Sequence, residues 1–265
     1  MSPPDAPSSR RRSAPRPRRP LTADERAVYE WQLGIAGFGE EGQKALKGAS
    51  VLVTRVGGVG GAAATALAAA GIGRLVLAHR GNVRAGDLNR QTLMTADWVG
   101  KPRVESALKR LKELNPRVAV EVHNANVDER NVDGLVRAAD LVIDAAPLFR
   151  ERFLLNRAAV EQGKPMVDSA MYELEAQLTT VLPGRGPCLA CLYPGDPPGW
   201  RRRFPVFGAV STTIGALAAV EAIKVLSGLG EPLVGRLLVA DLGDMSFRTL
   251  RIRRNPRCSV CGGRP

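Results

Sequence analysis

An apolar run that passes into clustered glycines constrains the fold of this chain more than any other stretch. Residues 50–54 read Ser-Val-Leu-Val-Thr, and the glycines that follow lead into an Ala-rich segment at 61–70. This order predicts a buried strand, a tight turn and the start of a helix. The first N–H groups of such a helix point outward beside the positive end of its dipole, so a phosphate can bind there. The stretch therefore predicts a nucleotide site.

One position departs from the usual glycine pattern. The G-x-G-x-x-G frame of dinucleotide-binding proteins would need glycine at 55, 57 and 60, and Arg55 stands at the first of these. Gly57, Gly58 and Gly60 remain, and they would let the backbone approach a phosphate closely. We expect the side chain of Arg55 to lie near that phosphate.

Strand and helix patterns alternate along the first two thirds of the chain. Strands are expected at 50–54, 74–78, 118–122 and 141–144, and residues 165–168 lead into a fifth strand. Helices are expected at 58–70, 101–114, 129–137 and 149–162. Two short helical patterns precede them within 22–46, the first with a Thr22–Glu25 capping box. Later elements are strands at 174–182, 236–241 and 246–252 and a long buried helix at 207–227. The predicted fold class is α/β, a Rossmann-like, doubly wound, mostly parallel sheet with C-terminal antiparallel strands.

Length and composition fit an ordinary globular protein. The chain has 265 residues, of which 45% are hydrophobic and 24% charged. The most apolar stretch, 205–227, is interrupted by polar and charged residues, so we do not expect a membrane span. No apolar region of a secretory signal is found near the N-terminus, which favours a cytoplasmic protein.

The net charge of +12 is concentrated in part at the N-terminus. Residues 1–20 hold six arginines against Asp5 and are rich in Pro and Ser. Such a segment has too few apolar side chains to offset the entropy of ordering, so we expect a disordered tail before a domain at 21–265. A nucleic-acid partner is not expected, because no aromatic residues are interleaved with the basic ones.

All four cysteines fall in two C-x-x-C pairs. These are Cys188 with Cys191 and Cys258 with Cys261, separated by 66 residues. Two such pairs can supply four thiolates to a closed tetrahedral zinc site with no open position for catalysis. The pattern predicts a structural zinc ion that ties the middle of the chain to its C-terminus. The alternatives are two redox dithiols or four ordinary cysteines.

Short motifs follow one another in a recognisable order from residue 37 to residue 262. They are Gly-Phe-Gly at 37–39, Gln-Lys-Ala-Leu at 43–46, Gly-Gly-Val-Gly at 57–60, Asp-Leu-Asn-Arg-Gln at 87–91, Gly-Lys-Pro at 100–102, Val-Glu-Ser-Ala at 104–107, Leu-Asn-Pro at 114–116, Glu-Ala-Ile-Lys at 221–224 and Asn-Pro-x-Cys-x-x-Cys-Gly at 255–262. Together with the paired cysteines, this series resembles the ThiF/MoeB/HesA family, the bacterial relatives of ubiquitin-activating E1 enzymes.

The resemblance implies binding of ATP and Mg²⁺, adenylylation of the C-terminal glycine of a ubiquitin-like sulfur carrier, and release of pyrophosphate. Such a transfer depends on positioning and on cations around the phosphate charge. By position, Arg90 and Lys101 would be catalytic residues that hold phosphates. The other implied nucleotide-binding residues are Gly57, Gly58, Gly60, Asp87 and Gln91. The implied partners are a carrier protein or another carboxylate substrate, and a second subunit in a homodimer or heterodimer.

Departures from the family pattern gather at the nucleotide site. At the end of the second strand, His79 replaces the family's acid that hydrogen-bonds the ribose hydroxyls, and Gly81 replaces a second acid two residues later. Pro147 replaces an Asp that assists the metal, and Mg²⁺ needs oxygen ligands, so we expect Asp144 to substitute for it. Trp31 replaces the family's N-terminal arginine. These changes predict altered or lost catalysis, as in a pseudoenzyme or the non-catalytic half of a heterodimer.

Two alternatives stay open. The chain is an active adenylyltransferase on an unusual carboxylate if Arg55 replaces a lost cation. It is instead an NADP-binding oxidoreductase if the shifted frame Gly58-x-Gly60-x-x-Ala63 is read as G-x-G-x-x-A and His79-Arg80 binds a 2′-phosphate. No acid or base for hydride transfer is identifiable in the sequence.

Overall fold

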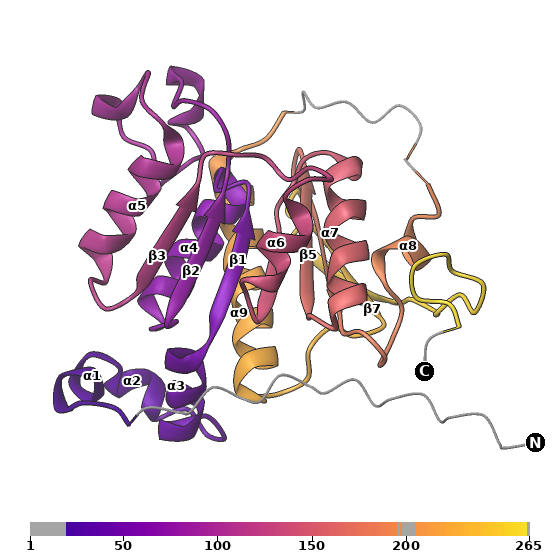
Figure 1. The fold of residues 1–265 in the computed structure, drawn as a ribbon, viewed down its shortest axis with the longest axis horizontal. Coiled ribbons are helices and arrows are strands. Elements are labelled where there is room, and N and C mark those ends of the chain that lie inside the picture. Colours follow the sequence, from indigo (N-terminus) through magenta and orange to yellow (C-terminus); the bar gives the residue numbers. More distant parts are fainter. Residues whose placement is uncertain (1–19, 196, 198–204, 264–265) are drawn as a thin grey trace, which may run out of the picture.

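Eight strands form one sheet in the part of the chain that the computed structural model describes, residues 20–195, 197 and 205–263 (Figure 1). Their bounds are β1 Ser50–Thr54, β2 Arg74–Ala78, β3 Ala119–His123, β4 Leu141–Asp144, β5 Met166–Tyr172, β6 Glu175–Val181, β7 Arg236–Asp241 and β8 Ser246–Arg251. The spatial order is β3-β2-β1-β4-β5-β6-β7-β8. Strands β1 to β5 pair in parallel, and β6 to β8 extend the sheet antiparallel. The predicted fold class is confirmed.

Strand β1 lies at the centre of the five parallel strands and is buried on both faces. Val51 and Val53 belong to the core on one face, whereas Leu52 points into the core on the other. Successive strand residues point to opposite faces, so a strand covered on both sides needs a continuous apolar run. This explains why residues 50–54 lack the alternation of a half-exposed strand.

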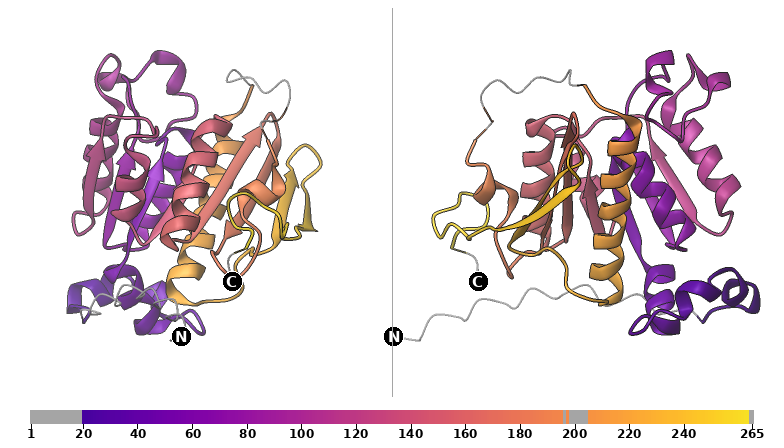
Figure 2. Two further views of the ribbon diagram at one scale, coloured as in Figure 1. Left: turned by 45° about the vertical axis from the view of Figure 1, so that its right-hand side comes forward. Right: turned by 180° about the vertical axis from the view of Figure 1, so that it is seen from behind.

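Helices cover both faces of this sheet (Figure 2). Their bounds are α1 Ala23–Val28, α2 Glu30–Leu33, α3 Gly39–Gly48, α4 Gly58–Ala69, α5 Arg103–Leu114, α6 Val132–Arg137, α7 Phe149–Gln162, α8 Leu189–Leu192 and α9 Gly208–Ser227. One core joins α4, α5 and α9 to the sheet, and the other joins α6, α7 and α8 to the opposite face. Helices α1 to α3 lie at the end of the sheet where β1 begins (Figure 1).

Most predicted elements are present, and the differences lie at their ends. The capping box of Thr22 and Glu25 opens α1, although three helices rather than two occupy the first segment. Helix α5 begins at Arg103 and not at 101, because Pro102 caps it in an extended conformation, with φ −59° and ψ 127°. The predicted tail at 1–20 lies outside the described residues, except for Pro20.

Helix α9 is long and apolar enough to cross a membrane by length and composition. Its residues Ile214, Ala218 and Ala222 are fully buried in the core of this model. A core helix passes the same test of length and composition, and the packing of α9 fits that description.

Helices α4 and α9 pack closely through small side chains. A Cβ atom on Gly215 would lie 2.4 Å from the carbonyl oxygen of Val59 and 2.7 Å from the Cβ of Ala62. Because both neighbouring atoms belong to a helix within the core, neither can move freely. Gly215 therefore sets the distance between the two helices.

We expect Gly215→Ala to lower the free energy of unfolding by about 1–3 kcal/mol, because the added methyl group overpacks this contact. Gly134→Ala in α6 is the matched control, since nothing lies within 4 Å of its added Cβ. In the control, the better helix propensity of alanine should raise stability by up to about 1 kcal/mol. Urea unfolding of both variants measures the difference, and a stabilised Gly215→Ala protein would contradict the predicted contact.

Candidate functional site

A cavity of about 930 Å³ lies at the carboxyl ends of the parallel strands. Its walls come from the turn after β1, the segment after β2, the loop after β4 and the residues just before α9. The strand order reverses between β1 and β4, which lie next to each other in the sheet. Ligands of open α/β sheets bind at such a reversal, where the loops after two neighbouring strands diverge.

The glycine turn after β1 forms one wall of this cavity. Gly57 caps α4, and both Gly57 and Gly58 line the cavity. Gly60 lies beneath the turn, where an added Cβ would be 2.6 Å from the carbonyl oxygen of Arg55. The N-terminus of the 12-residue helix α4 thus opens toward the cavity, as the sequence predicts.

Arg55 lines the cavity but is held by a buried carboxylate. It has a left-handed backbone conformation, with φ 58°, which costs a non-glycine residue about 1–3 kcal/mol. Its guanidinium pairs with Glu151 of α7, with Nε donating to Oε2 at 2.7 Å, and both residues are buried. Arg55 therefore reaches the predicted position, but Glu151 already balances its charge.

Asp87 accepts four hydrogen bonds within the segment after β2 that lines the cavity. Its carboxylate is buried and accepts the backbone N–H of Arg84 at 3.0 Å and the side-chain amide of Gln91 at 2.9 Å. Arg90 and Arg103 donate to it at 3.4 Å and 3.1 Å. Asp87 thus holds the two arginines and Gln91 in place at the cavity wall.

His79 ends this wall on the side of β2. It follows the last residue of the strand, is 6% exposed and lines the cavity. The Nη1 atom of Arg103 lies 3.3 Å from His79 Nε2. That nitrogen accepts the arginine N–H when the imidazole is neutral and carries its proton on Nδ1.

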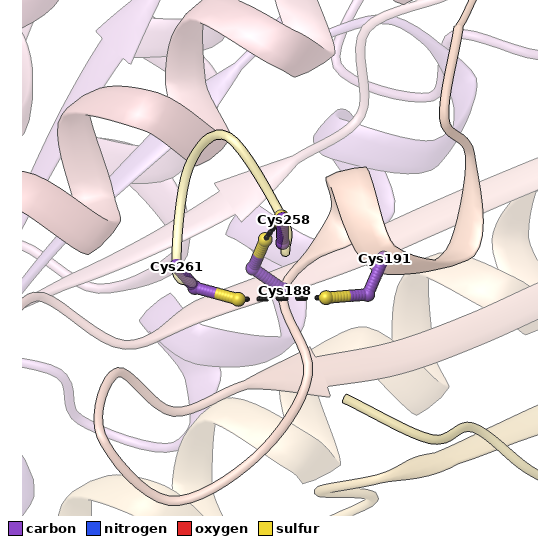
Figure 3. A group of neighbouring side chains, drawn as sticks. All are labelled: Cys188, Cys191, Cys258 and Cys261. Carbon is purple, nitrogen blue, oxygen red and sulfur yellow. Dashed lines mark hydrogen bonds between the residues drawn. The ribbon is translucent and has the colours of Figure 1, made fainter. Parts of the chain in front are cut away.

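The four cysteines meet on the opposite side of the sheet from α9 (Figure 3). Their Sγ atoms all lie within 4.8 Å of one another, with 3.7 Å between Cys188 and Cys258 and 3.4 Å between Cys191 and Cys261. Four sulfurs around a tetrahedral zinc ion would be about 3.8 Å apart, given Zn–S bonds of about 2.3 Å. The cluster can therefore hold a metal ion.

The model of the ThiF family matches residues 29–260. The chain belongs to the ThiF family. It is 50% identical over 242 residues to the heterocyst protein HesA of Trichormus variabilis, with 91% of each chain covered. It is 42% identical over 253 residues to the sulfur carrier protein adenylyltransferase of Thermus thermophilus, covering 92% of this chain and 93% of the relative. The crystal structure of E. coli MccB with ATP is similar at a TM-score of 0.74 and 25% identity, covering 84% of this chain and 69% of that one.

One residue predicted for the nucleotide site of this ThiF-family chain lies elsewhere. Lys101 is exposed and absent from the cavity wall, and its ammonium lies 5.4 Å from the centre of the Trp98 ring. Arg103, two residues later, lines the cavity instead. Because α5 starts only after Pro102, its first residue is Arg103. The position of Pro102 in the sequence is the signal that could have pointed to Arg103 as a residue of the cavity wall.

Asp144, which was expected to replace the missing metal-binding acid, does not line the cavity either. The residue is fully buried at the end of β4, does not line the cavity, and accepts the backbone N–H of Ala146 at 2.8 Å. Its register partner on β5 is Asp168, whose carboxylate lies 3.4 Å from Arg152 Nη1. Asp144 therefore belongs to a buried charge cluster behind the loop after β4.

This cluster contains two carboxyl groups and one guanidinium. Arg152 also donates to the carbonyl oxygens of Ala146 at 2.8 Å and Ser169 at 3.1 Å, which ties the loop to β5. Burial raises the pKa of Asp144 to about 8, against the opposing effect of Arg152. Burial raises the pKa of Asp168 as well. The pair thus retains a proton at neutral pH, since one cation cannot balance two buried carboxylates.

The retained proton predicts a pH dependence. An unfolded Asp releases its proton above about pH 4, while the folded pair keeps it to about pH 8, so stability falls as pH rises between these values. The slope is at most about 1.4 kcal/mol per pH unit for one proton. Asp144→Asn carries no such proton. Between about pH 5.5 and 7.5, wild type should lose at least about 1 kcal/mol more stability than this variant in urea unfolding. Equal losses would argue against a shared proton.

Proposed function

We propose that this chain binds a nucleotide by its phosphates in the cavity and acts as an E1-like protein on a carboxylate partner. The observation that carries the proposal is the cavity itself, where the N-terminus of α4 and five arginines face one space at the carboxyl edge of the sheet. Further support comes from the sulfur carrier protein adenylyltransferase that is 42% identical to this chain. The proposed partner is a ubiquitin-like carrier protein or another molecule with a free carboxylate.

The proposed chemistry is adenylyl transfer. A carboxylate oxygen of the partner attacks the α-phosphorus of ATP, the bond to the bridging oxygen breaks, and pyrophosphate leaves with the electron pair. Negative charge spreads over the phosphate oxygens during this step, so nearby fixed cations stabilise it. Arg90 and Arg103 are the residues we assign to this role, because Asp87 orients both at the cavity wall.

The described residues of the cavity wall do not offer a good Mg²⁺ ligand. Asp87 is the only carboxylate among them, and four donors already use it. Asp144 is buried behind the loop, and Pro147 lines the cavity without a side-chain oxygen. Mg²⁺ in nucleotide sites is typically held by one or two carboxylates as well as by phosphates. We therefore propose altered catalysis, in which the arginines carry the phosphate charge.

A second candidate function is that of a non-catalytic subunit, in a homodimer or a heterodimer. Trp31 favours it, because this large apolar residue is 92% exposed, and Val28 and Ile35, close to it in the sequence, are exposed as well. Exposed large apolar residues of this kind fit a subunit contact. In this reading the chain completes or regulates a competent partner. A cytoplasmic location and the absence of nucleic-acid partners stay predictions.

Titration calorimetry with ATP tests nucleotide binding on the full chain. We expect Arg103→Ala to weaken binding at least tenfold, as one charge-assisted contact to phosphate is lost. Lys101→Ala removes the same charge two residues away, outside the cavity, and should change the affinity less than twofold. No ATP binding by a folded wild-type chain would refute the proposed function.

Pyrophosphate exchange with candidate carrier proteins then separates the two functions. Carrier-dependent exchange supports an active adenylyltransferase. Binding of ATP without exchange for any carrier supports the non-catalytic subunit.

We further propose that the metal in the cysteine cluster is zinc and that its role is structural. Two observations support this: the cluster has four thiols and no other ligand type, and three of the cysteines are buried. Burial raises the pKa of Cys188 to about 12, so this thiol would be deprotonated only by binding a cation. A closed set of four sulfurs leaves no position for a substrate.

Replacement of Cys258 tests the zinc proposal. We expect Cys258→Ser to reduce bound zinc from one per chain toward zero and to lower the melting temperature by more than about 10 °C. Structural zinc contributes roughly 10 kcal/mol to the free energy of folding in small zinc domains. Each 1 kcal/mol corresponds to a change of about 2–4 °C in melting temperature. Ser259→Ala, an exposed position in the same loop, is the control and should change neither value. Zinc-free wild-type protein of unchanged stability would contradict the prediction.

A further inference from the structure

The cavity carries more positive charge than its own carboxylates can balance. Among the described residues, five arginines line it, and four of them, Arg80, Arg84, Arg90 and Arg103, belong to the part between the end of β2 and the start of α5. Glu151 pairs with Arg55, and Asp87 is the single carboxylate among the wall residues that the structure describes. Two carboxylates cannot neutralise five guanidinium groups. The excess charge therefore lies on the segment that follows β2, which also borders the glycine turn at Arg90 and Gln91.

The Asp87 carboxylate has no capacity left for a neutral sugar. Its Oδ1 atom accepts from Gln91 and Arg90, and its Oδ2 atom accepts from the backbone of Arg84 and from Arg103. A carboxylate oxygen offers about two lone-pair positions, and both positions on each oxygen are used. Ribose hydroxyls, which donate to an acid in sites that bind unmodified nucleotides, would find no carboxylate acceptor here.

The end of β2 instead presents hydrogen-bond donors and open space. His79 lies against Arg103, and Arg80 is exposed at the cavity wall. Gly81 lines the same wall with φ +102°, and no atom lies within 4 Å of where its Cβ would be. Cations beside an unfilled space suit an oxyanion such as a phosphate.

We infer that the end of β2 is a second anion subsite, so that the cavity binds a nucleotide whose ribose carries a phosphate group more tightly than one whose ribose is unmodified, such as the ATP of the proposed function. In related nucleotide folds an acid at this strand end binds a ribose hydroxyl, whereas an arginine accommodates a ribose phosphate. The first anion subsite is the glycine turn, so the ligand spans two phosphate positions within one cavity of about 930 Å³. The inference rests on the proposed function, because it requires that the cavity binds a nucleotide at all.

Titration calorimetry with three small probes tests this subsite on the full chain. The probes are AMP, adenosine 2′,5′-bisphosphate and adenosine 3′,5′-bisphosphate, which share adenosine and one 5′-phosphate. We expect at least one bisphosphate to bind ten times more tightly than AMP or better. Two variants should bring this ratio close to one: Arg80→Ala, an exposed position unlikely to disturb folding, and His79→Asp, which returns an acid to the strand end.

Lys109→Ala is the charge-matched control for the two variants. This lysine lies exposed on α5, the helix that also carries Arg103, and pairs with Glu113 outside the cavity. The ratio should survive in this control, which separates a built subsite from a general effect of positive charge. Equal loss in Lys109→Ala and Arg80→Ala would overturn the inference.

The remaining outcomes distinguish this inference from the proposed function. If ATP and AMP bind while neither bisphosphate binds more tightly than AMP, the second subsite is refuted and the proposed function stands. If none of the adenine nucleotides binds to the folded chain, both are refuted.

Discussion

Helices α4 and α9 approach each other so closely at Gly215 that their packing fixes the glycine turn before α4 relative to the part of the cavity wall formed by α9. The contact continues to the cavity, where an added Cβ on Gly58 would lie 2.7 Å from the Cβ of Ser211. Small residues are needed at every such point, because any added methyl group would meet a backbone or a helix in the core. This requirement explains the Ala- and Gly-rich composition of both helices better than helix propensity does, since glycine lowers that propensity.

Buried charges hold the loops around the cavity in place. The Arg55–Glu151 pair joins the turn after β1 to α7, and Arg152 joins the loop after β4 to β5. Such pairs contribute little net stability, because removing ions from water offsets their attraction. Their geometric effect is larger: each guanidinium fixes two segments that are far apart in the sequence. The loops after β1 and β4, which border the cavity on its two sides, are both fixed in this way.

The helices and strands could be predicted well from the sequence, whereas the partners of individual side chains could not. Apolar runs and their glycine and proline boundaries depend on local geometry, which is why β1, β4, β7 and α7 were predicted at their observed positions. Arg55 was expected to lie near the phosphate. Its ion pair with Glu151 could not be predicted, because Glu151 lies 96 residues away and no local pattern connects the two residues. Lys101 was predicted to hold a phosphate from its motif position alone, and Arg103 was not considered, although Pro102 makes Arg103 the first residue of α5. Asp144 was assigned to the metal because its burial depends on the pairing of β4 with β5, a long-range feature.

A metal ion in the cysteine cluster would close a loop in the chain. Cys188 and Cys261 mark its ends, and between them lie α9, β7, β8 and the segment at 205–206 that lines the cavity. Joining two points separated by some 70 residues removes conformational entropy from the unfolded chain, and the gain grows only slowly with the length of the loop. A metal ion at the edge of the molecule would thus limit how far one wall of a distant cavity can separate from the others. With a metal ion bound, the chain from Cys188 to Cys261 would form a closed loop, and this loop would include residues 205–206 of the cavity wall.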